Sequence, residues 1–572
     1  MNGFLQKLSH FFRKENFSNL FYWAIIFCIF FINTFHESYP DEFDNILGGW
    51  YILHGRLPYV GFFTHHGPVA YFIAALVVLF SGQSFVRFRI VYAVLLFLYT
   101  LFVSRFLIKS IGKEIKNVIF LFVGILALSA TYYWFHMLLA DSVSAFLLLP
   151  SIALLSMKAV QKKSLTIPDV IFLSVSTTLA VLCSLTYIYL VLCLYLFAFI
   201  LYFRNEILFN RRTVLAIGII IVPYILFGLY LVITRSFSDY YYDAFVFNQK
   251  YYIYNYPRPA GITTINPLRF AIVIAHDFFD RFFALLVQVR DFNFSYPANI
   301  TFAIADVTMA IYLISKRKFL VACFFILFCT YANGRSNPLT SGETDYQSAV
   351  YIFISLFAIC FLFVSLLKEI SKETESAKKF IYQFLFIPLA LYSLFLGTYF
   401  FNKFGDKFYG KYMGTAPLIY DRPQVAPIIN LLLKPTDYVW VGPFEFEELF
   451  YTNVAPASRY DILNPGMGES DRISQGQVTD IETTKPKIVW YNPNFYILGR
   501  KPADYAPLFN TMLARDYVTL YDYRDGKTKY ISAIPITQRV DLEKYLYIRK
   551  ENVNEIVRKL LADNLVVAVS IK

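Results

Sequence analysis

Charged residues and cysteine motifs are both scarce in this chain of 572 residues. Charged residues make up 16% of it, against roughly 25% in an average soluble domain, whereas hydrophobic residues make up 57% and aromatic residues 19%. The mean hydropathy is +0.50. These values exclude a disordered chain, a coiled coil and an ordinary cytosolic enzyme, and they predict a polytopic α-helical membrane protein.

The six cysteines all lie inside long apolar runs, and the sequence has no CxxC pair and no Cys/His cluster. A disulfide framework or a zinc site is therefore not expected. A phosphate-binding glycine loop is also missing, because the GMG at 466–468 lacks the strand–loop–helix context that such a loop needs. We accordingly expect no cofactor, with a divalent metal as the open alternative.

Several apolar runs are long enough to cross a bilayer, which takes about 17–25 residues. The eleven predicted spans lie near 17–35, 87–108, 117–134, 139–157, 168–185, 187–203, 213–234, 299–315, 318–333, 346–367 and 379–401. The apolar stretch 67–80 is short, and 267–290 is interrupted by charges. Both are predicted to be helices that lie at the membrane interface or insert only halfway.

The basic residues predict the orientation of these spans. With the N-terminus in the cytoplasm, the cytoplasmic segments contain 19 Lys or Arg residues and six Asp or Glu residues, as the positive-inside rule requires. The net charge of +12 is therefore a topology signal, and no nucleic-acid partner is expected. Eleven spans then place the C-terminus outside, in a multi-pass protein of the plasma (inner) membrane.

Residues 402–572 differ in composition from the rest, with many turn-forming residues and nearly balanced charge, 22 basic against 20 acidic. Strand-like runs occur at 438–442, 488–491, 517–521 and 529–533, and helix-like runs at 424–433, 541–549 and 552–562. We predict a membrane domain over 1–401 and a C-terminal extracytoplasmic α/β domain over 402–572. Two large segments of the membrane domain, 36–86 and 235–298, are predicted to face outward.

Acidic residues near the predicted outer boundary are candidates for chemistry, because charges at membrane depth are costly. The segment 38–55 predicts a short helix with Asp41, Asp44 and Asn45 on one face. An outward carboxylate can act as a general base toward a hydroxyl, or it can cap the helix and stabilise its dipole. Asp141, at the outer start of the span 139–157, has the same two interpretations.

His65 and His66 precede a Gly-Pro pair at a predicted helix start. A metal site there would need more ligands, which Asp41 and Asp141 could supply. Hydrogen bonding to a polar substrate, or shaping of a pocket, needs no additional ligands, and this interpretation of the two histidines is favoured.

Basic and aromatic residues also face outward on this topology. The basic candidates are Lys250, Arg258, Arg269 and Arg335. The Arg335 guanidinium can clamp a phosphate with two hydrogen bonds, or it can anchor a helix at the interface. The Tyr-rich stretch 240–256 can stack on a sugar or lipid head group, or it can form an interfacial aromatic belt.

The order of motifs over residues 17–160 resembles a known family. After the first span come PDE (40–42), GGWYILHGRLPY (48–59), HHGPVAYFIAALVVLFSG (65–82), RFRIVYAVLL (87–96) and MLLADSVSAFLLL (137–149). This series is similar to the GT-C superfamily membrane glycosyltransferases of the protein-mannosyltransferase and aminoarabinose-transferase type, and closest to their RgtA/B/C/D-like bacterial group. The family often has Lys-Pro-Pro where this chain has His66-Gly67-Pro68, so the contacts to a donor phosphate are expected to differ.

The resemblance implies an integral-membrane glycosyltransferase. It would move a hexose or pentose from a polyprenyl-phosphate donor to an acceptor hydroxyl of a lipid, glycan or protein on the outer face, with inversion in a single displacement. Asp41 would be the catalytic base, Glu42 its partner, and Asp141 the residue that positions the base or the acceptor. The substrate-binding candidates are Asp44, His65, His66, Lys250, Arg258 and Arg335.

A transporter, flippase or polymerase of lipid-linked glycans is the alternative function, with a receptor or scaffold ranked below it. Transporters tend to place charges and broken helices at the bilayer midplane, often in two related halves. This sequence has no internal symmetry, and its acidic residues cluster near the predicted outer boundary. Both features favour the transferase.

Overall fold

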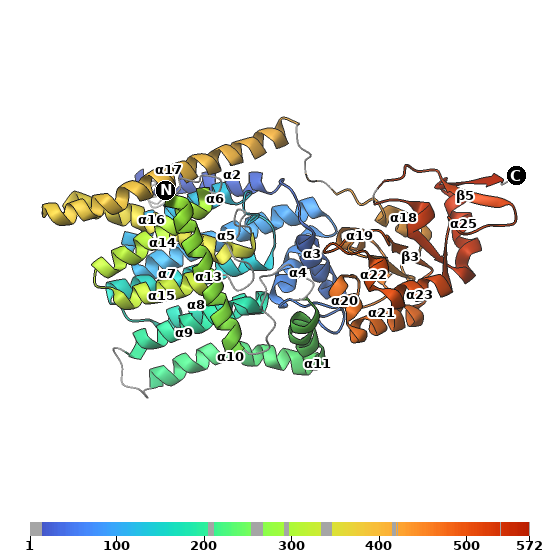
Figure 1. Ribbon diagram of the computed structural model, residues 1–572, viewed down its shortest axis with the longest axis horizontal. Helices are drawn as coiled ribbons and strands as arrows, with labels where there is room; N and C mark the ends of the chain where they lie inside the picture. The colour runs from blue at the N-terminus through green and yellow to red at the C-terminus, as the bar shows by residue number, and fades with distance from the viewer. Residues whose placement is uncertain are drawn as a thin grey trace, which may run out of the picture. The chain divides into compact units, whose positions relative to one another are not determined.

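A computed structural model describes residues 14–203, 211–252, 267–290, 297–332, 346–414, 419, 421–537 and 539–570. The chain divides into two compact units (Figure 1). Unit 1 comprises Met1–Ser38, Ser84–Leu226 and Ala271–Tyr420. Unit 2 comprises Tyr39–Gln83, Phe227–Phe270 and Asp421–Lys572. Unit 2 therefore joins the C-terminal region to most of 36–86 and to part of 235–298, the segments predicted to face outward.

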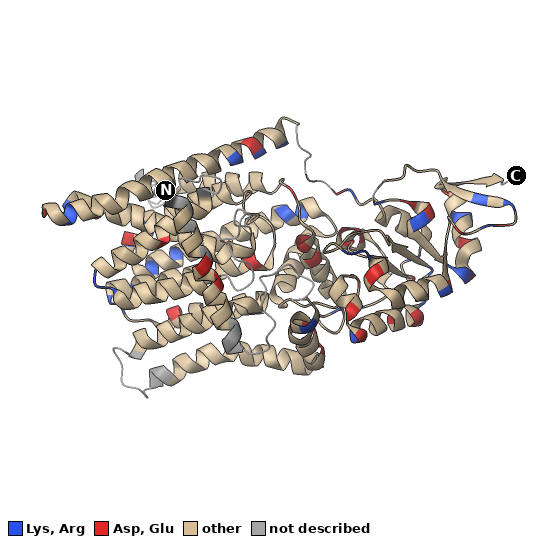
Figure 2. Cartoon of the chain, viewed as in Figure 1, with Lys and Arg blue, Asp and Glu red and all other residues tan. Residues whose placement is uncertain are grey.

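Unit 1 is a bundle of apolar helices. Its helices are α2 (Lys14–Asn33), α5 (Phe85–Ile111), α6 (Lys116–Ser129), α7 (Ala140–Gln161), α8 (Ile167–Cys183), α9 (Ile188–Phe203), α10 (Arg211–Ile233), α13 (Pro267–Arg290), α14 (Pro297–Ser315), α15 (Phe319–Tyr331), α16 (Ala349–Lys372) and α17 (Ser376–Tyr412). Most of α10 and α13 belongs to this unit. Figure 2 shows that the helices carry few charged residues along their lengths.

Each of the eleven predicted spans coincides with a helix, so the predicted class of a polytopic helical membrane protein with a C-terminal α/β region is confirmed. Among the described residues, seven helices are long and apolar enough to cross a membrane, and four apolar ones are shorter. The count of eleven spans stays a prediction. One predicted span, 117–134, is a helix only to Ser129, and the last helix continues past residue 401 to Tyr412.

The core of unit 1 lies around α7 and α16. Most residues of these two helices are buried, whereas only a small share of the residues of α10 and α17 is buried. Small hydroxyl residues let α7 and α8 approach closely, and the Ser151 and Ser176 hydroxyls lie 2.6 Å apart. At the far end of the same helix pair, the Lys158 ammonium donates to the buried Asp169 carboxylate.

Unit 2 begins with two helices that pack unusually closely, α3 (Pro40–Leu53) and α4 (Val69–Ser81). A Cβ added to Gly48 would lie 2.2 Å from Cδ1 of Tyr71, and one added to Gly49 would lie 2.6 Å from backbone atoms of Ala74 and Ala75. No other residue fits at these two positions without a shift of α4. The short helix predicted over 38–55 is thus present, and it is one half of a helical pair.

The C-terminal part of unit 2 contains a five-stranded mixed sheet in the order β2-β1-β3-β6-β4. Its strands are β1 (Tyr438–Gly442), β2 (Ala455–Pro456), β3 (Ile488–Tyr491), β4 (Tyr517–Thr519) and β6 (Leu546–Arg549). β1 is parallel to β2 and β3, whereas β6 is antiparallel to β3 and β4. A separate antiparallel pair joins β5 (Thr528–Ser532) to β7 (Val566–Ser570).

The prediction of a helix over 541–549 is wrong for the second half of that range. Only Leu542–Tyr545 is helical, as α24, and Leu546–Arg549 is the strand β6. Pairing with β3 on one side and β4 on the other overrides the local helical preference of these residues. The predicted runs at 438–442 and 488–491 match β1 and β3, and 552–562 matches α25 (Val553–Ala562).

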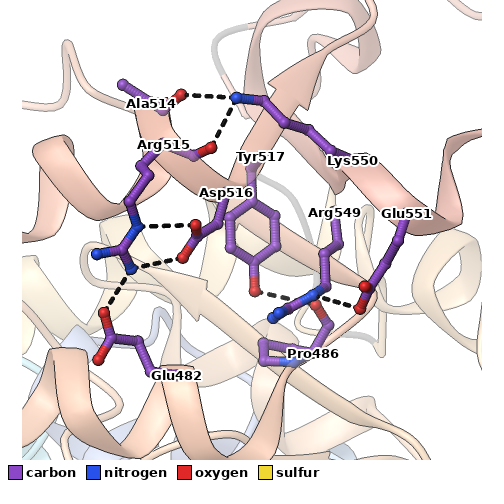
Figure 3. Close-up of polar contacts among 9 residues, drawn as sticks. All are labelled: Glu482, Pro486, Ala514, Arg515, Asp516, Tyr517, Arg549, Lys550 and Glu551. Atoms are coloured by element: carbon purple, nitrogen blue, oxygen red, sulfur yellow. Dashed lines mark hydrogen bonds and ion pairs between the residues drawn. The ribbon is translucent and has the colours of Figure 1, made fainter.

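Helices cover this sheet and hold its apolar core. They are α18 (Ala426–Leu432), α19 (Phe446–Tyr451), α20 (Pro465–Glu469), α21 (Asp471–Thr484), α22 (Pro502–Tyr505), α23 (Pro507–Asp516) and α25. Trp440, Tyr491 and Phe509 pack together in the core. On the surface, Lys550 donates to the carbonyls of Ala514 and Arg515 at the end of α23 (Figure 3), where a cation is favoured.

Candidate functional site

The α3–α4 pair of unit 2 carries a chain of hydroxyl and carboxyl groups. The Tyr71 hydroxyl donates to Oδ2 of Asp44 at 2.9 Å, and it lies 2.8 Å from the Thr64 hydroxyl. Because Gly48 leaves room for the Tyr71 ring, the hydroxyl reaches the carboxylate one turn earlier on α3. The close packing of two helices therefore creates a polar connection from α3 to the segment before α4.

Three carboxyl groups lie near one another at this pair. Burial raises the pKa of Asp44 to about 8, with the Tyr71 hydrogen bond opposing the rise and the charges of Asp41 and Asp461 adding to it. Burial also raises the pKa of Asp461 to about 6, although the Tyr51 hydroxyl and Arg56 lower it. At neutral pH, Asp44 is therefore protonated in the folded protein and can donate a hydrogen bond.

Two arginines join the segment before α4 to the C-terminal part of unit 2. The Arg56 guanidinium donates to the carbonyls of Gly61 and Ser458, at 2.7 and 3.2 Å from Nη2. The Arg459 guanidinium donates to the Tyr59 carbonyl at 2.6 Å, and the Phe63 amide donates to the Arg459 carbonyl at 2.8 Å. These bonds fix the position of Asp461 relative to α3, since Asp461 follows two residues after Arg459.

The two histidines lie on this segment and are held mainly through their backbones. The Asn248 amide donates to the His65 carbonyl at 2.9 Å, and the Tyr59 hydroxyl donates to the His66 carbonyl at 2.8 Å. The two imidazole rings have centroids 4.0 Å apart. Among the residues that the structure describes, no group of three or more His, Cys, Asp or Glu side chains is arranged to hold a metal.

A second charged cluster involves the π-helix η3 (Tyr242–Tyr252), which follows α11 (Phe237–Tyr241). Asp243 is fully buried, and Oδ2 lies 3.7 Å from Nη2 of Arg459, whose Nη1 lies 3.1 Å from Asp239. Burial raises the pKa of Asp243 to about 7, and Arg459 opposes that rise. Arg472 pairs with Asp239 at 2.7 Å. A predicted substrate ligand, Lys250, is exposed on η3.

The remaining predicted site residues fall elsewhere. Glu42 is fully buried in the first turn of α3, next to the partly buried Asp41. Asp141 belongs to unit 1, where it is buried at the start of α7 and accepts from the Tyr187 hydroxyl at 3.0 Å. Leu139 is the N-cap of that helix, so Asp141 stands in the first turn rather than at the cap. Arg258 and Arg335 lie outside the described residues.

Sequence reasoning missed Asp461, Tyr71, Arg459 and Asp243. Asp461 and Arg459 lie about 400 residues from their partners on α3 and its following segment, and no local pattern distinguishes them. The Gly48-Gly49 pair was the available signal for Tyr71, because two glycines inside a helix indicate a close neighbour. The missed residues are the ones whose roles depend on contacts distant in sequence.

The fold and these clusters define a multi-pass helical membrane protein whose second unit concentrates partly protonated carboxyl groups. Neither the known protein families nor the curated proteins yielded a match to this chain. Among solved structures, the chain is similar to the crystal structure of ArnT from Cupriavidus metallidurans in the apo state. That similarity has a TM-score of 0.49 and 12% sequence identity, and it covers 82% of this chain and 89% of that chain.

A likeness at this TM-score and identity carries no conclusion about this chain. What the chain does depends on its own side chains.

Proposed function

We propose that this protein is a membrane glycosyltransferase that transfers a sugar from a polyprenyl phosphate to an acceptor hydroxyl on the outer face of the membrane. Asp41 is the general base in this proposal, and the C-terminal region lies on the same outer side. The observation that carries the proposal is the group of carboxyls at α3, in which Asp44 is protonated at neutral pH beside Asp41. A carboxyl group that stays protonated beside a second carboxyl group is typical of acid–base sites.

The reaction is a single displacement. Asp41 takes the proton of the acceptor hydroxyl as its oxygen bonds to the anomeric carbon. The bond from that carbon to the phosphate oxygen breaks, and the polyprenyl phosphate leaves with the electron pair, so the configuration at the carbon inverts. Asp44, held by Tyr71, donates a hydrogen bond to a sugar or acceptor hydroxyl and orients it for attack.

Replacing Asp41 by Asn tests the proposal. The amide cannot accept the proton, so we expect transfer to fall by roughly 10²–10⁴-fold, the usual contribution of a general base. The measurement is mass spectrometry of cell-envelope glycans from cells that carry the wild-type protein, the variant or no copy. Asp406→Asn on α17 is the matched control, because Asp406 is exposed on unit 1.

We expect the Asp406→Asn cells to retain the glycan made by wild type, and the Asp41→Asn cells to match those without a copy. Equal amounts of both variants in the membrane show that insertion is unaffected. Wild-type glycan levels in the Asp41→Asn cells would rule out Asp41 as the base. Identical glycans with and without the wild-type gene would rule out the proposed transferase activity.

A further inference from the structure

A group of basic side chains gathers at one end of the helices of unit 1. Arg89 comes from the first turns of α5, and Lys407 and Lys411 come from the last turns of α17. The last turns of α2 and α6 reach the same place, since Asn33 donates to the Ala127 carbonyl at 2.9 Å and Tyr412 donates to the Ile32 carbonyl at 3.3 Å. Four elements therefore meet where their apolar stretches end.

The contacts within this basic cluster are specific. Nη2 of Arg89 donates to the Glu37 carbonyl at 2.9 Å. The Lys407 ammonium donates to the Glu37 carboxylate and, at 3.1 Å, to the Thr131 carbonyl. Arg89 is 1% exposed and Lys411 is 6% exposed, whereas the Lys407 side chain is 28% exposed. Two of the three cations are thus almost removed from solvent.

Two histidines lie beside these cations. Burial, with Lys407 and Lys411 adding to it, lowers the pKa of His36 to about 4. Burial and Arg89 also lower the pKa of His136, whose ring centroid lies 6.4 Å from that of His36. Both imidazoles are neutral at neutral pH, and the one N–H of His136 donates to the Ala130 carbonyl, with Nδ1 at 3.2 Å from that oxygen.

The cluster already contains one anion, the Glu37 carboxylate, which pairs with Lys407. Lys407 and Lys411 are four residues apart on one helix face, where like charges repel. Burying positive charge at the edge of an apolar bundle costs more free energy than leaving it in water, and such residues usually mark sites. Guanidinium and ammonium groups together match the oxygens of a phosphate.

We propose that Arg89, Lys407 and Lys411 form a binding site for the phosphate group of a lipid phosphate. This inference rests on the proposed function, for which it names the protein's contacts to the phosphate of the donor or of the released carrier. The place of the cluster, at the ends of apolar helices, fits a phosphate whose chain remains among those helices.

Binding of a polyprenyl monophosphate to the purified full-length protein in detergent tests the site. The probes are the polyprenyl monophosphate, the matching polyprenol and inorganic phosphate, and native mass spectrometry reads the bound fraction. We expect wild type to prefer the monophosphate to the polyprenol by at least about tenfold, the value of one charge-assisted hydrogen bond. The double variant Lys407→Gln/Lys411→Gln should lose this preference and bind polyprenol as wild type does.

Two control variants keep the result interpretable. Lys403→Gln removes an exposed lysine one turn away on α17 and should bind the monophosphate as wild type does. Lys407→Arg/Lys411→Arg keeps both charges and should retain the preference, which separates lost charge from lost folding. A glutamine double variant that still prefers the monophosphate overturns the site. If inorganic phosphate binds through these lysines and the lipid phosphate does not, the site does not take its phosphate from a lipid, and the proposal is wrong.

The test also separates this inference from the proposed function. Asp41→Asn should bind the monophosphate with wild-type affinity, because Asp41 is not part of the cluster. A protein that binds lipid phosphate through these lysines but transfers no sugar supports the site and removes the transferase. If the protein transfers sugar but the glutamine double variant keeps its preference for the monophosphate, the transferase is supported and the phosphate site is wrong.

Discussion

Buried carboxyl groups have different surroundings in the two units. In unit 1 each has a close partner of its own: Lys158 for Asp169, the Tyr187 hydroxyl for Asp141, and the Tyr351 and Ser355 hydroxyls for Asp306. In unit 2 the buried carboxyls also have partners, the Tyr71 hydroxyl for Asp44 and Arg459 for Asp243, but they lie near other acids as well: Asp44 near Asp41 and Asp461, and Asp243 near Asp239. Separate partners stabilise a helix bundle, whereas neighbouring acids raise one another's pKa values and allow proton transfer.

The difference follows from how each unit is assembled. Unit 1 is made mostly of consecutive helices, so a polar group can be satisfied by a neighbouring helix. Unit 2 is made of three segments far apart in the chain, and its acids meet only when α3, η3 and the C-terminal region come together. We therefore expect the largest effects of single substitutions where one side chain joins those segments.

Arg459→Met is expected to have the largest effect. It removes the contacts of one guanidinium with Asp239, with Asp243 and with the Tyr59 carbonyl, and leaves Asp243 buried without its cation. Breaking a buried ion pair from one side costs about 3–5 kcal/mol. Limited proteolysis of the purified protein should show faster cleavage within 421–572 than in wild type. Arg500→Met, at a more exposed pair with Glu469, is the control and should be cleaved at the wild-type rate.

Gly49→Ala is expected to have the next largest effect. The new Cβ meets the backbone of α4 at 2.6 Å, and backbone cannot move aside as a side chain can. Overpacking of this kind costs about 1–3 kcal/mol. The apparent unfolding temperature in detergent should fall, and transfer activity should fall with it because Tyr71 and Asp44 separate.

Gly397→Ala on α17 is the matched control in unit 1. Nothing lies within 4 Å of its added Cβ, so alanine should be neutral or should stabilise the helix by about 0.5–1 kcal/mol. If both glycines tolerate alanine equally, the close approach of α3 and α4 does not exist in solution.

Asp44→Asn should change how stability depends on pH. The folded protein holds the Asp44 proton up to a pKa of about 8, whereas the unfolded chain releases it near 3.8. The stabilisation is complete below the unfolded value and is lost as pH rises through the folded value. Asn has no proton to release, and its oxygen still accepts from Tyr71. We therefore expect the two proteins to be equally stable near pH 4 and the advantage of the variant to grow steadily as the pH rises to about 8.

Melting curves of both proteins over that pH range provide the measurement. Asp243, whose pKa is also raised, is not among the charges that act on Asp44, so it contributes a similar slope to both proteins and cancels in the difference. A difference that is constant with pH would show that Asp44 keeps its ordinary pKa.

Arg515→Gln should have the smallest effect. This arginine pairs with Glu482 and Asp516 on the surface of unit 2 (Figure 3), where solvent and salt screen the charges. We expect no measurable change in the unfolding temperature. A clear fall would mean that the surface pairs of unit 2 matter as much as its buried ones, and it would weaken the contrast between the units.

Parts of the site could be predicted and parts could not. Asp41, Glu42, Asp44, His65 and His66 were candidates because polar residues are rare next to apolar spans, and the structure places all five in unit 2. Whether Asp41 acts as a base stays a prediction. Asp461 could not be found, because its neighbours in sequence are an ordinary loop and its neighbours in space come from α3. The strand β6 was missed for the same reason, since its partners β3 and β4 determine it.

The sequence by itself determined the membrane class, the positions of the long helices and the composition break before the C-terminal region. Hydropathy and span length are local properties, so a window of about 20 residues is enough to read them. The tertiary structure alone decided that α3, η3 and the C-terminal region form one unit, that Asp44 stays protonated at neutral pH, and that Arg89 joins two lysines of α17. Desolvation and Coulomb interactions depend on neighbours in space, and only the folded chain supplies those neighbours.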